Sequence, residues 1–409
     1  MGEWRWKGEI SGVTVGERPV ILVFIHTYLP GERAGGPVRS VSQIVSRFDN
    51  EFTFRILTSD RDVGGKERYP GIDRDVWLPM GNAKIMYLSP ERRRLASLAK
   101  FLRRLSFDGV YLPTFFHKRF SRDIMFLVGI GVLPHFRRRT VIAPSGEFHS
   151  GALAIKNYRK MGFLRLAVAS GFYDDVIWRA TSREEMSEIR YWFGQQAEVI
   201  LAPHFISTGE LRKSQRSREP KARGFIRMVF LSRVDKKKNL NGGLKFLRRL
   251  KGKVEFHIFG PLDDPGYWEI CQSMIRSLPP NIRVDYRGVI PFSQVVEVLS
   301  GYDLFFLPTF GENFGHVIPE ALMAGCPVLI SDRTPWKDLE ECGAGWSFPL
   351  EEPHRFEAAL QACVDMDADV HSAMVRKATE YISRKAEEMN PEDRIRKVFR
   401  RLVEKSRRE

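Results

Sequence analysis

The chain has 409 residues and a formal net charge of +15, with 43% hydrophobic and 28% charged residues. This length exceeds what one hydrophobic core usually serves, so we expect two domains. The composition is typical of a globular protein and excludes collagen-like, low-complexity and solenoid-repeat architectures. The four cysteines form no CxxC pair, which favours a reduced, cytoplasmic environment and argues against a structural zinc site.

Neither the N-terminal segment nor the most apolar later segment predicts a signal peptide or a membrane-spanning helix. Residues 1–19 are polar, contain Trp4 and Trp6, and lack the apolar core of a signal peptide. The most apolar later stretch, residues 124–136, is interrupted by glycines and a proline and is too short to cross a bilayer. We expect a buried helix there.

The first half alternates predicted strands and helices. Residues 20–26 form a continuous apolar run, typical of a parallel strand buried on both faces. A glycine-containing loop follows, and apolar residues at helical spacing from Val38 to Phe48 predict a helix. Further strands are predicted at residues 54–57, 84–87, 109–112, 141–143, 176–180 and 198–201. This alternation predicts a parallel, doubly wound sheet.

Ser182 and Glu185 have the spacing of a capping box, in which the serine accepts from the third helical amide and the glutamate reaches back to the cap amide. This places a helix start directly after the strand at 176–180.

A second series of strands and helices begins at residue 226. Its strands are predicted at residues 226–231, 254–259, 282–286, 304–307 and 327–330. We therefore expect two Rossmann-like domains, of residues 1–205 and 225–385, joined by a polar linker at 206–224. A basic C-terminal helix at 386–409 is free to pack back on the first domain. Ligands of such sheets bind at the carboxyl ends of the strands, so we expect the chemistry in an interdomain cleft.

The most specific segment of the sequence, residues 308–328, reads PTFGENFGHVIPEALMAGCPV. Gly311 and Gly315 allow close backbone approach to a ligand, and the following helix N-terminus offers amides to an anion. Glu312 in the loop is placed to face a sugar, and Glu320 on the helix to accept from ribose hydroxyls. For the isolated pair, a helix cap plus a surface acid is the favoured interpretation, whereas for the whole segment it is not.

This segment resembles the signature E-G-F-G-x-x-x-x-E-A-M-A-x-G-x-P-V of family 4 of the retaining glycosyltransferases, with Asn313 in place of the usual glycine. Residues 230–239, FLSRVDKKKN, resemble the family's strand-end phosphate site, with Ser232 where glycine is usual. The resemblance implies that Arg233 and Lys238 clamp the donor diphosphate, whose negative charge grows as the glycosidic bond breaks. We expect Lys236 and Lys237 to be solvated.

The resemblance also implies a set of donor-binding residues. A glycine-rich first loop resembles the one that lies under the donor phosphates, and the segments HIFGP and DYRGV resemble a strand turn and a nucleobase-reading segment. The implied donor-binding residues are Gly35, Gly36, Arg233, Lys238, Gly260, Gly288, Val289, Asn313, Phe314, Gly315, His316 and Glu320.

On the acceptor side, residues 143–153 (APSGEFHSGAL) follow a predicted strand at the place where many family members carry a catalytic-loop histidine. They resemble a branch of the family that makes bacterial surface polysaccharides. Glu147 is the candidate group that accepts or orients the acceptor hydroxyl, and the alternative is a loop carboxylate that caps the next helix. The implied catalytic set is Glu312, Glu147, Arg233 and Lys238.

Taken together, the resemblance implies a GT-B fold. It also implies sugar transfer from a UDP- or GDP-sugar to the hydroxyl of a saccharide or lipid-linked acceptor, with retention, in polysaccharide biosynthesis. It implies no cofactor and no metal, and the sequence offers no DxD triplet for a divalent ion.

Two other functions fit parts of the sequence. The charge of +15 is compatible with nucleic-acid binding, but the basic clusters are scattered and no known recognition motif accompanies them, so nucleic acid is not expected. A phosphorylase or epimerase of the same fold is the other alternative. The first would need a cofactor-lysine motif that we do not find, and the second would not need Glu312 and Glu320 in this context.

The basic clusters at residues 92–94, 103–104 and 137–139, with Trp4 and Trp6, predict peripheral binding to the anionic inner face of a membrane. The alternative is a solvated basic surface adapted to anionic substrates. The sequence carries no signal for an oligomeric state.

Overall fold

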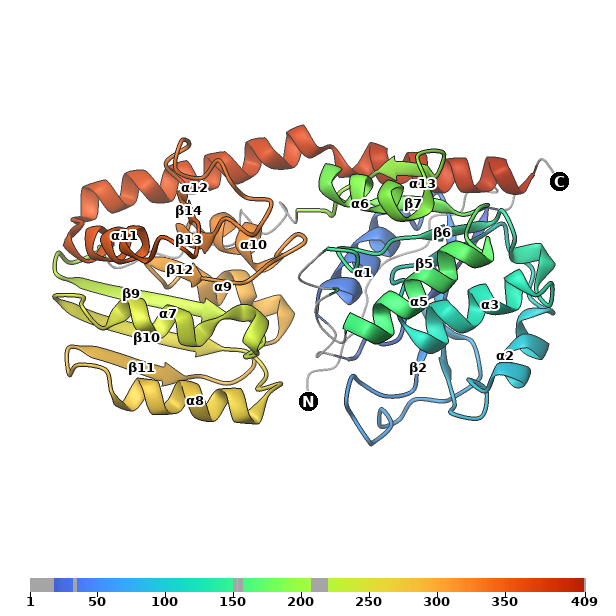
Figure 1. The fold of residues 1–409 in the computed structure, drawn as a ribbon, viewed down its shortest axis with the longest axis horizontal. Coiled ribbons are helices and arrows are strands. Elements are labelled where there is room, and N and C mark those ends of the chain that lie inside the picture. Colours follow the sequence, from blue (N-terminus) through green and yellow to red (C-terminus); the bar gives the residue numbers. More distant parts are fainter. Residues whose placement is uncertain (1–17, 32–34, 150–152, 154–156, 207–219, 408–409) are drawn as a thin grey trace. The chain divides into compact units, whose positions relative to one another are not determined.

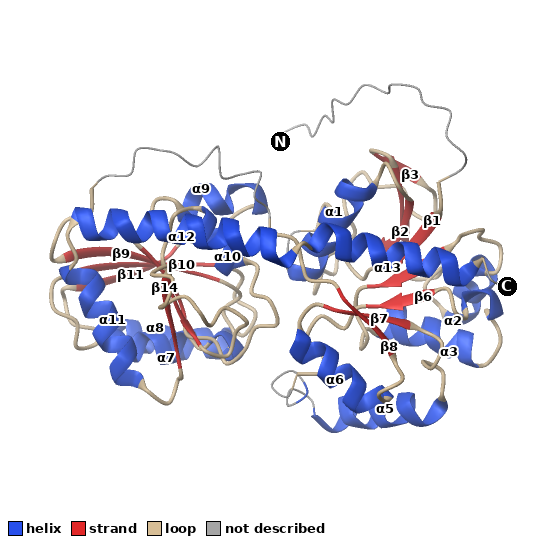
Figure 2. Ribbon diagram, turned by 90° about the horizontal axis from the view of Figure 1, so that it is seen from above, coloured by secondary structure: helices blue, strands red, loops and turns tan. Residues whose placement is uncertain are grey.

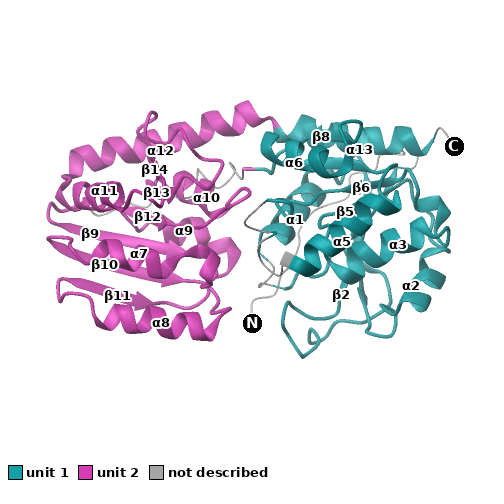
Figure 3. Ribbon diagram, in the orientation of Figure 1, with its two compact units in different colours: residues 1–205, 391–409 teal, residues 206–390 magenta. Residues whose placement is uncertain are grey.

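The computed structural model of the protein describes residues 18–31, 35–149, 153, 157–206 and 220–407. Helices and strands alternate along most of the chain (Figures 1 and 2). The chain divides into two compact units: unit 1 comprises Met1–Phe205 with Pro391–Glu409, and unit 2 comprises Ile206–Asn390 (Figure 3). The last helix of the chain therefore belongs to the same unit as the first strand.

Unit 1 is built on an eight-stranded sheet with the order β3-β4-β2-β1-β5-β6-β7-β8. All neighbouring strands in it are parallel except β3 and β4. The strands are β1 (Val20–Phe24), β2 (Thr53–Ser59), β3 (Leu78–Met80), β4 (Ala83–Leu88), β5 (Gly109–Leu112), β6 (Thr140–Ile142), β7 (Ile177–Ala180) and β8 (Glu198–Leu201). The order runs outwards from β1 in both directions, as in a doubly wound sheet.

Helices cover both faces of this sheet (Figure 2). One face is covered by α2 (Leu95–Leu102), α3 (Asp123–Gly129), α5 (Asn157–Ser170) and α6 (Arg183–Phe193), which share one hydrophobic core. The other is covered by α1 (Gly36–Phe48) and α13 (Pro391–Ser406), which share a second core. Short turns of π- and 3-10 helix occur at Lys118–Arg122 and Pro134–Phe136.

Unit 2 has a six-stranded sheet of order β11-β10-β9-β12-β13-β14, and all neighbouring strands in it are parallel. The strands are β9 (Phe225–Leu231), β10 (Lys253–Phe259), β11 (Ile282–Tyr286), β12 (Leu304–Leu307), β13 (Val328–Ser331) and β14 (Gly345–Phe348). The helices are α7 (Leu240–Leu247), α8 (Pro265–Arg276), α9 (Val295–Leu299), α10 (Val317–Met323), α11 (Pro353–Asp365) and α12 (Ala368–Met389). The predicted fold class, two Rossmann-like doubly wound domains, is confirmed.

Three local predictions differ from the structure. The helix expected over 124–136 ends at Gly129, and Gly131 then adopts a φ of 76°. Only half of the capping box forms: Ser182 accepts from the Glu185 amide, but the Glu185 carboxylate does not return to Ser182. The Glu185 carboxylate instead accepts hydrogen bonds from the amide and the hydroxyl of Thr181, at 2.7 and 2.6 Å.

The third difference concerns the C-terminal helix expected over 386–409. Asn390, with a φ of 37°, ends α12, and Pro391 begins the separate helix α13. A left-handed residue followed by proline is a common way to end one helix, and proline fits the first position of the next. No helix in the part of the chain that the structure describes combines the length and apolarity needed to cross a bilayer.

The linker predicted at 206–224 is described only at its ends, because residues 207–219 lie outside the described residues. Near its far end Lys221 is buried, and its Nζ donates to the carbonyl oxygens of Phe225 and Met366 at 2.9 and 3.0 Å. Burial lowers its pKa from the ordinary value. This part of the predicted linker is therefore packed into unit 2 rather than solvated.

Helix α13 completes the core of unit 1. The Phe399 side chain is 1% exposed, and its ring centroid lies 5.5 to 6.5 Å from the rings of Phe48, Phe52, Phe54 and Tyr111. Ion pairs fasten the polar side of the helix, from Arg396 to Glu51 and from Arg401 and Lys405 to Glu198.

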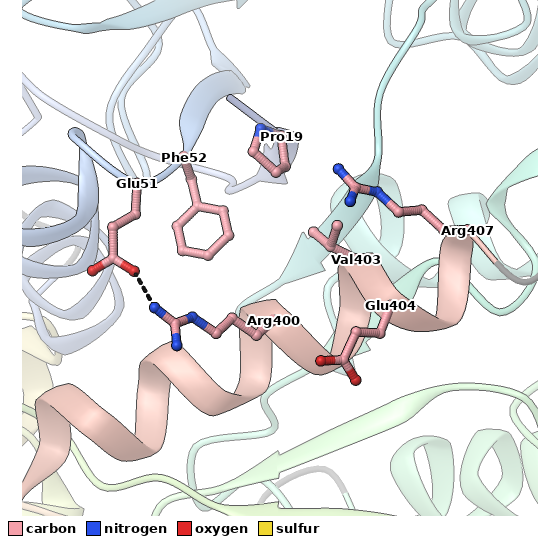
Figure 4. A pocket seen from close by; sticks show the side chains of 7 residues that line it. All are labelled: Pro19, Glu51, Phe52, Arg400, Val403, Glu404 and Arg407. Atoms are coloured by element: carbon pink, nitrogen blue, oxygen red, sulfur yellow. Dashed lines mark hydrogen bonds and ion pairs between the residues drawn. The ribbon is translucent and has the colours of Figure 1, made fainter. Parts of the chain in front are cut away.

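A shallow pocket lies between α13 and the start of the sheet (Figure 4), where Arg400 pairs with Glu51 beside Phe52. Pro19 and Phe52 precede β1 and β2, so the pocket lies at the amino-terminal edge of the sheet. Sheets of this class bind substrates at the opposite edge. We therefore assign this pocket no substrate.

Replacing Phe399 with alanine tests the role of α13 in the core. We expect the variant to lose about 3–5 kcal/mol of stability in unit 1, as is usual when a buried phenylalanine is truncated. Urea denaturation should show an earlier transition than in the parent protein. The exposed Lys397→Ala on the same helix is the control, and equal midpoints for the two variants would contradict the packing role.

Candidate functional site

Strands β9 and β12 are neighbours in the sheet of unit 2, with Met228 opposite Leu304 and Val229 opposite Phe305. Both run parallel, so the segments that follow them leave the same edge of the sheet. These segments are the two motifs singled out in the sequence, residues 230–239 and 308–328. The topology therefore brings together two motifs that are about 70 residues apart in the chain.

The two loops are joined by hydrogen bonds to backbone carbonyl groups. The Lys237 carbonyl accepts from the Phe310 amide at 2.8 Å and from the Thr309 hydroxyl at 3.1 Å. In the other direction, the Asn239 side chain donates to the Pro308 carbonyl at 2.8 Å. Asn239 has a φ of 56°, a conformation that asparagine tolerates better than most residues. The position of each loop is thus fixed by the other.

The centre of this arrangement is an ion pair between the Lys238 ammonium and the Glu312 carboxylate. The two side chains are 10% and 11% exposed, and the Thr309 hydroxyl lies 3.4 Å from the same carboxylate oxygen. The structure thus joins the predicted phosphate-binding lysine directly to the predicted sugar-facing glutamate.

Lys237 was expected to be solvated, and that expectation is wrong. Its side chain is half-buried, and burial lowers its pKa from the ordinary value, although the nearby Glu312 carboxylate opposes this. Lys236 is exposed as expected. The site therefore holds a second cation beside Lys238 that the sequence pattern did not single out.

Arg233 lies at the accessible side of the same loop. Its side chain is 50% exposed and forms ion pairs with Asp263 at 3.2 Å and Asp235 at 3.5 Å. Ion pairs of a guanidinium this exposed are weak, so a phosphate can replace the carboxylates at little cost. The guanidinium is therefore available to an incoming anion.

Gly260 supports this loop by close packing. It has a φ of 131°, and a Cβ atom there would lie 1.9 Å from the Ser232 carbonyl oxygen. Its amide donates to the Gly288 carbonyl at 2.8 Å, which ties the ends of β10 and β11 together. Val289, next to Gly288, is 54% exposed. Of these predicted donor-binding residues, Val289 presents an accessible side chain, whereas Gly260 has a packing role.

The turn from Asn313 to His316 leads from the loop into α10. Phe314 is 6% exposed, its ring packs 5.3 Å from that of Trp336, and its carbonyl accepts from the Trp336 indole at 2.6 Å. Gly315 has a φ of 69°, which allows the chain to turn. Glu320, on α10, is buried at 7% exposure. Glu312 and Glu320 are thus both held inside this part of unit 2, and their predicted donor contacts stay predictions.

At the carboxyl edge of the sheet in unit 1, the structure brings together two histidines that the sequence analysis missed. His26 follows β1 and His117 follows β5, and their rings stack with centroids 4.4 Å apart. Burial, with a smaller contribution from the neighbouring His26, lowers the pKa of His117 to about 4. The Nδ1 atom of His117 accepts from the Phe120 amide at 3.2 Å, so the neutral ring carries its proton on Nε2.

Glu147 follows β6 on the same edge. One of its carboxylate oxygens accepts from the amides of Phe115 and Phe116 at 2.5 and 3.1 Å. Burial raises its pKa to about 7, against the opposing effect of these two amides. The carboxylate thus fastens the loop after β6 to the loop after β5, and its predicted role toward an acceptor stays a prediction.

The remaining predicted site residues of unit 1 begin α1. Gly35 is exposed with a φ of 59°, and Gly36 is the first residue of the helix. Residues 32–34, which precede them, lie outside the described residues. Within the described ranges, no group of three or more histidine, cysteine, aspartate or glutamate side chains is arranged to hold a metal ion.

Comparison with known proteins agrees with this arrangement. Residues 212–381 match the family model described as glycosyl transferases group 1, which contains both motifs of unit 2. A search of curated proteins gives no match. The matched segment lies within unit 2 and covers most of it.

Solved structures of similar fold cover almost the whole chain. Sucrose-phosphate synthase from Thermosynechococcus elongatus is 16% identical with a TM-score of 0.65, covering 90% of this chain and 94% of its own. WaaG, a glycosyltransferase involved in lipopolysaccharide biosynthesis, is 14% identical with a TM-score of 0.60, covering 91% and 99%. HepE from Anabaena, solved with UDP and glucose, is 13% identical with a TM-score of 0.62, covering 91% and 97%. The predicted GT-B fold is confirmed.

The lowered pKa of His117 predicts a specific loss of stability in acid. A histidine in the unfolded chain titrates near pH 6.5, whereas His117 in the folded protein titrates near pH 4. Between these two values the unfolded state binds a proton that the folded state does not. The resulting stability is fully present above pH 6.5 and is lost as the pH falls toward 4. His117→Asn, which keeps an acceptor for the Phe120 amide, should therefore show a shallower decline in urea midpoint over this range. The exposed His354→Asn is the control, and identical declines in both variants would contradict the burial of His117.

Proposed function

We propose that the protein is a retaining glycosyltransferase that moves a sugar from a UDP- or GDP-sugar to the hydroxyl of a saccharide or lipid-linked acceptor. The observation that carries this proposal is the contact between Lys238 and Glu312 at the carboxyl edge of adjacent strands. It lies in the region that matches glycosyl transferases group 1. The neighbours of similar fold include a protein solved with UDP and glucose, which is the ligand chemistry proposed here.

The geometry suits a glycosyl diphosphate. In such a donor the anomeric carbon and the first phosphorus share one oxygen, so a group that contacts the sugar must lie close to a group that contacts the phosphate. Lys238 and Glu312 satisfy this requirement because they are already in contact. As the bond between the anomeric carbon and that oxygen breaks, the electron pair stays on the diphosphate. Lys238 and Arg233 are the cations proposed to stabilise this charge.

The proposed division of roles follows from burial. Arg233 is exposed and would bind the phosphate attached to the nucleoside. Lys238 is buried and would bind the phosphate attached to the sugar. Glu312 would turn from Lys238 toward the sugar hydroxyls, and Glu320 would accept from the ribose. Retention of anomeric configuration rests on the resemblance to family 4. Glu147 is proposed to position the acceptor loop, because its carboxylate already holds two amides.

A polysaccharide-type acceptor is supported by the resemblance of residues 143–153 and by the fold shared with WaaG. Nucleic-acid binding is not favoured, because much of the basic C-terminal helix pairs with Glu51 and Glu198 within unit 1. A calorimetric screen of UDP, GDP, ADP and CMP tests the donor class. Binding of UDP or GDP supports the proposal, and binding of none of the four contradicts it.

Replacing Arg233 or Lys238 with alanine should weaken binding of the nucleoside diphosphate while the chain stays folded. A hydrogen bond to a charged group contributes about 1.5–3 kcal/mol, which corresponds to roughly a 10- to 150-fold loss of affinity. Calorimetry with the diphosphate found in the screen measures this. Lys236→Ala, on the exposed neighbour, is the control, and affinities like that of the control in both variants would exclude the diphosphate clamp.

Sugar transfer should not require a divalent ion. Activity is expected to survive an excess of EDTA, because Arg233 and Lys238 supply the charge that a metal supplies in other transferases. The measurement is the initial rate with and without chelator. A complete loss that manganese or magnesium restores would show that the proposed metal independence is wrong.

A further inference from the structure

Three helices on one face of unit 1 form a continuous outer surface. The Arg122 guanidinium at the start of α3 lies 3.8 Å from the ring centroid of Phe163 on α5. At the other end of α3, a Cβ atom on Gly129 would lie 2.2 Å from the ring of Phe172, just past α5. Helix α3 therefore lies beside the second half of α5 (Figures 1 and 2). Arg103, at the end of α2, donates to the Val132 carbonyl at 3.1 Å and extends the surface.

The outward side of α3 and α5 carries large apolar residues. On α3 and directly after it, Phe126 and Ile130 are 46% and 50% exposed. On α5, Tyr158 and Leu166 are 75% and 65% exposed. Phe126 lies one turn beyond Arg122, and Leu166 lies about one turn beyond Phe163, so both lie between the two contacts that join the helices. We call Phe126, Ile130, Tyr158 and Leu166, with the arginines Arg159 and Arg165, the α3–α5 surface.

The charge of this region is predominantly positive. Residues 124–173 contain seven lysines and arginines and a single acidic residue, Glu147. Glu147 is held by the amides of Phe115 and Phe116, away from the outer surface. Helix α5 has no acidic residue, and its arginines Arg159 and Arg165 are exposed. Acidic residues border this region: Asp123, the first residue of α3, pairs with Lys118 and Arg119, and Asp174 is exposed just past α5. On α5 itself, the apolar residues are accompanied by positive charge alone.

We propose that the α3–α5 surface binds an anionic lipid bilayer. Exposed aromatic and aliphatic side chains enter the boundary between headgroups and acyl chains, and arginines beside them pair with anionic headgroups. A second copy of the chain does not suit this surface, because a two-fold contact would bring the same patch of both copies together and offer Arg159 and Arg165 no acidic partner from α5. An acidic protein would satisfy the arginines, but it would leave the exposed Phe126 and Leu166 to be matched separately.

This surface differs from the one expected from the arginine clusters. Arg93 is committed to Ser59 and Asp60 at 3.0 and 3.1 Å, and Arg137 and Arg138 both pair with Asp175. Trp4 and Trp6 lie outside the described residues. Membrane binding thus rests on α5, a helix that the charge clusters did not mark. It is independent of the reaction catalysed in unit 2.

The test is flotation of the full-length protein with vesicles of phosphatidylcholine, alone or mixed with phosphatidylglycerol. We expect binding to the mixed vesicles at low salt, weaker binding at high salt, and little binding to phosphatidylcholine alone. Arg159→Ala with Arg165→Ala should lower the partition coefficient about 30-fold, the effect of two basic residues that each contribute about 1 kcal/mol. Arg249→Ala with Lys251→Ala, exposed residues of unit 2, is the control for equal loss of charge.

A second pair of variants tests the apolar part separately. Phe126→Ser with Leu166→Ser should reduce binding that remains at high salt, whereas Ile270→Ser with Val370→Ser, on exposed positions of unit 2, should not. Unchanged circular dichroism shows that each variant is folded. The proposal is overturned if the α5 variants bind like their controls, or if phosphatidylcholine alone binds equally well. It is also overturned if the parent protein is a dimer that does not bind vesicles and the apolar variant is a monomer.

Discussion

The buried ion pair between Lys238 and Glu312 is the interaction on which the proposed active site depends. Removing one partner of such a pair costs about 3–5 kcal/mol, because the other is left charged in a poorly solvated place. Neither loop can therefore move away alone. A bound phosphate offers Lys238 a replacement for Glu312, and a sugar offers Glu312 a replacement for Lys238. A ligand that carries both groups can open the pair without leaving either charge unpaired, whereas a free phosphate or a free sugar cannot.

Carboxylates also order the loops of unit 1, but there they bind backbone amides. Glu147 joins the loops after β5 and β6, and Glu185 accepts from Gly146 at 2.6 Å as well as from Thr181. These contacts position the predicted acceptor loop from both sides. The same edge holds the stacked pair of His26 and His117, whose lowered pKa values keep the rings neutral near pH 7. Neutral imidazole rings can exchange hydrogen bonds with hydroxyl groups, and the Arg93 guanidinium adds one positive charge near them.

The sequence predicted best those elements whose structure follows from a pattern within a single short segment. Apolar runs such as residues 226–231 predicted buried parallel strands, and the neighbouring positions of the two motifs followed from strand parallelism. The edge strands β3 and β14 were missed because their sequences, LPM and GWSF, are not continuous apolar runs. The histidine pair was missed because His26 and His117 meet only if β1 lies beside β5. Neither strand's own sequence indicates which strand will be its neighbour.

The two compact units are not two successive segments of the chain, and this affects how the protein can be made. The core around α1 needs Phe399 and its neighbours on α13, which are synthesised after unit 2. Unit 2, Ile206–Asn390, lies entirely before them. At about 5–20 residues per second, a ribosome spends roughly 10–40 s on that stretch. During this time one face of the sheet in the first half of the protein is covered by α1 but not by α13, and the unit that begins second is the first able to finish folding.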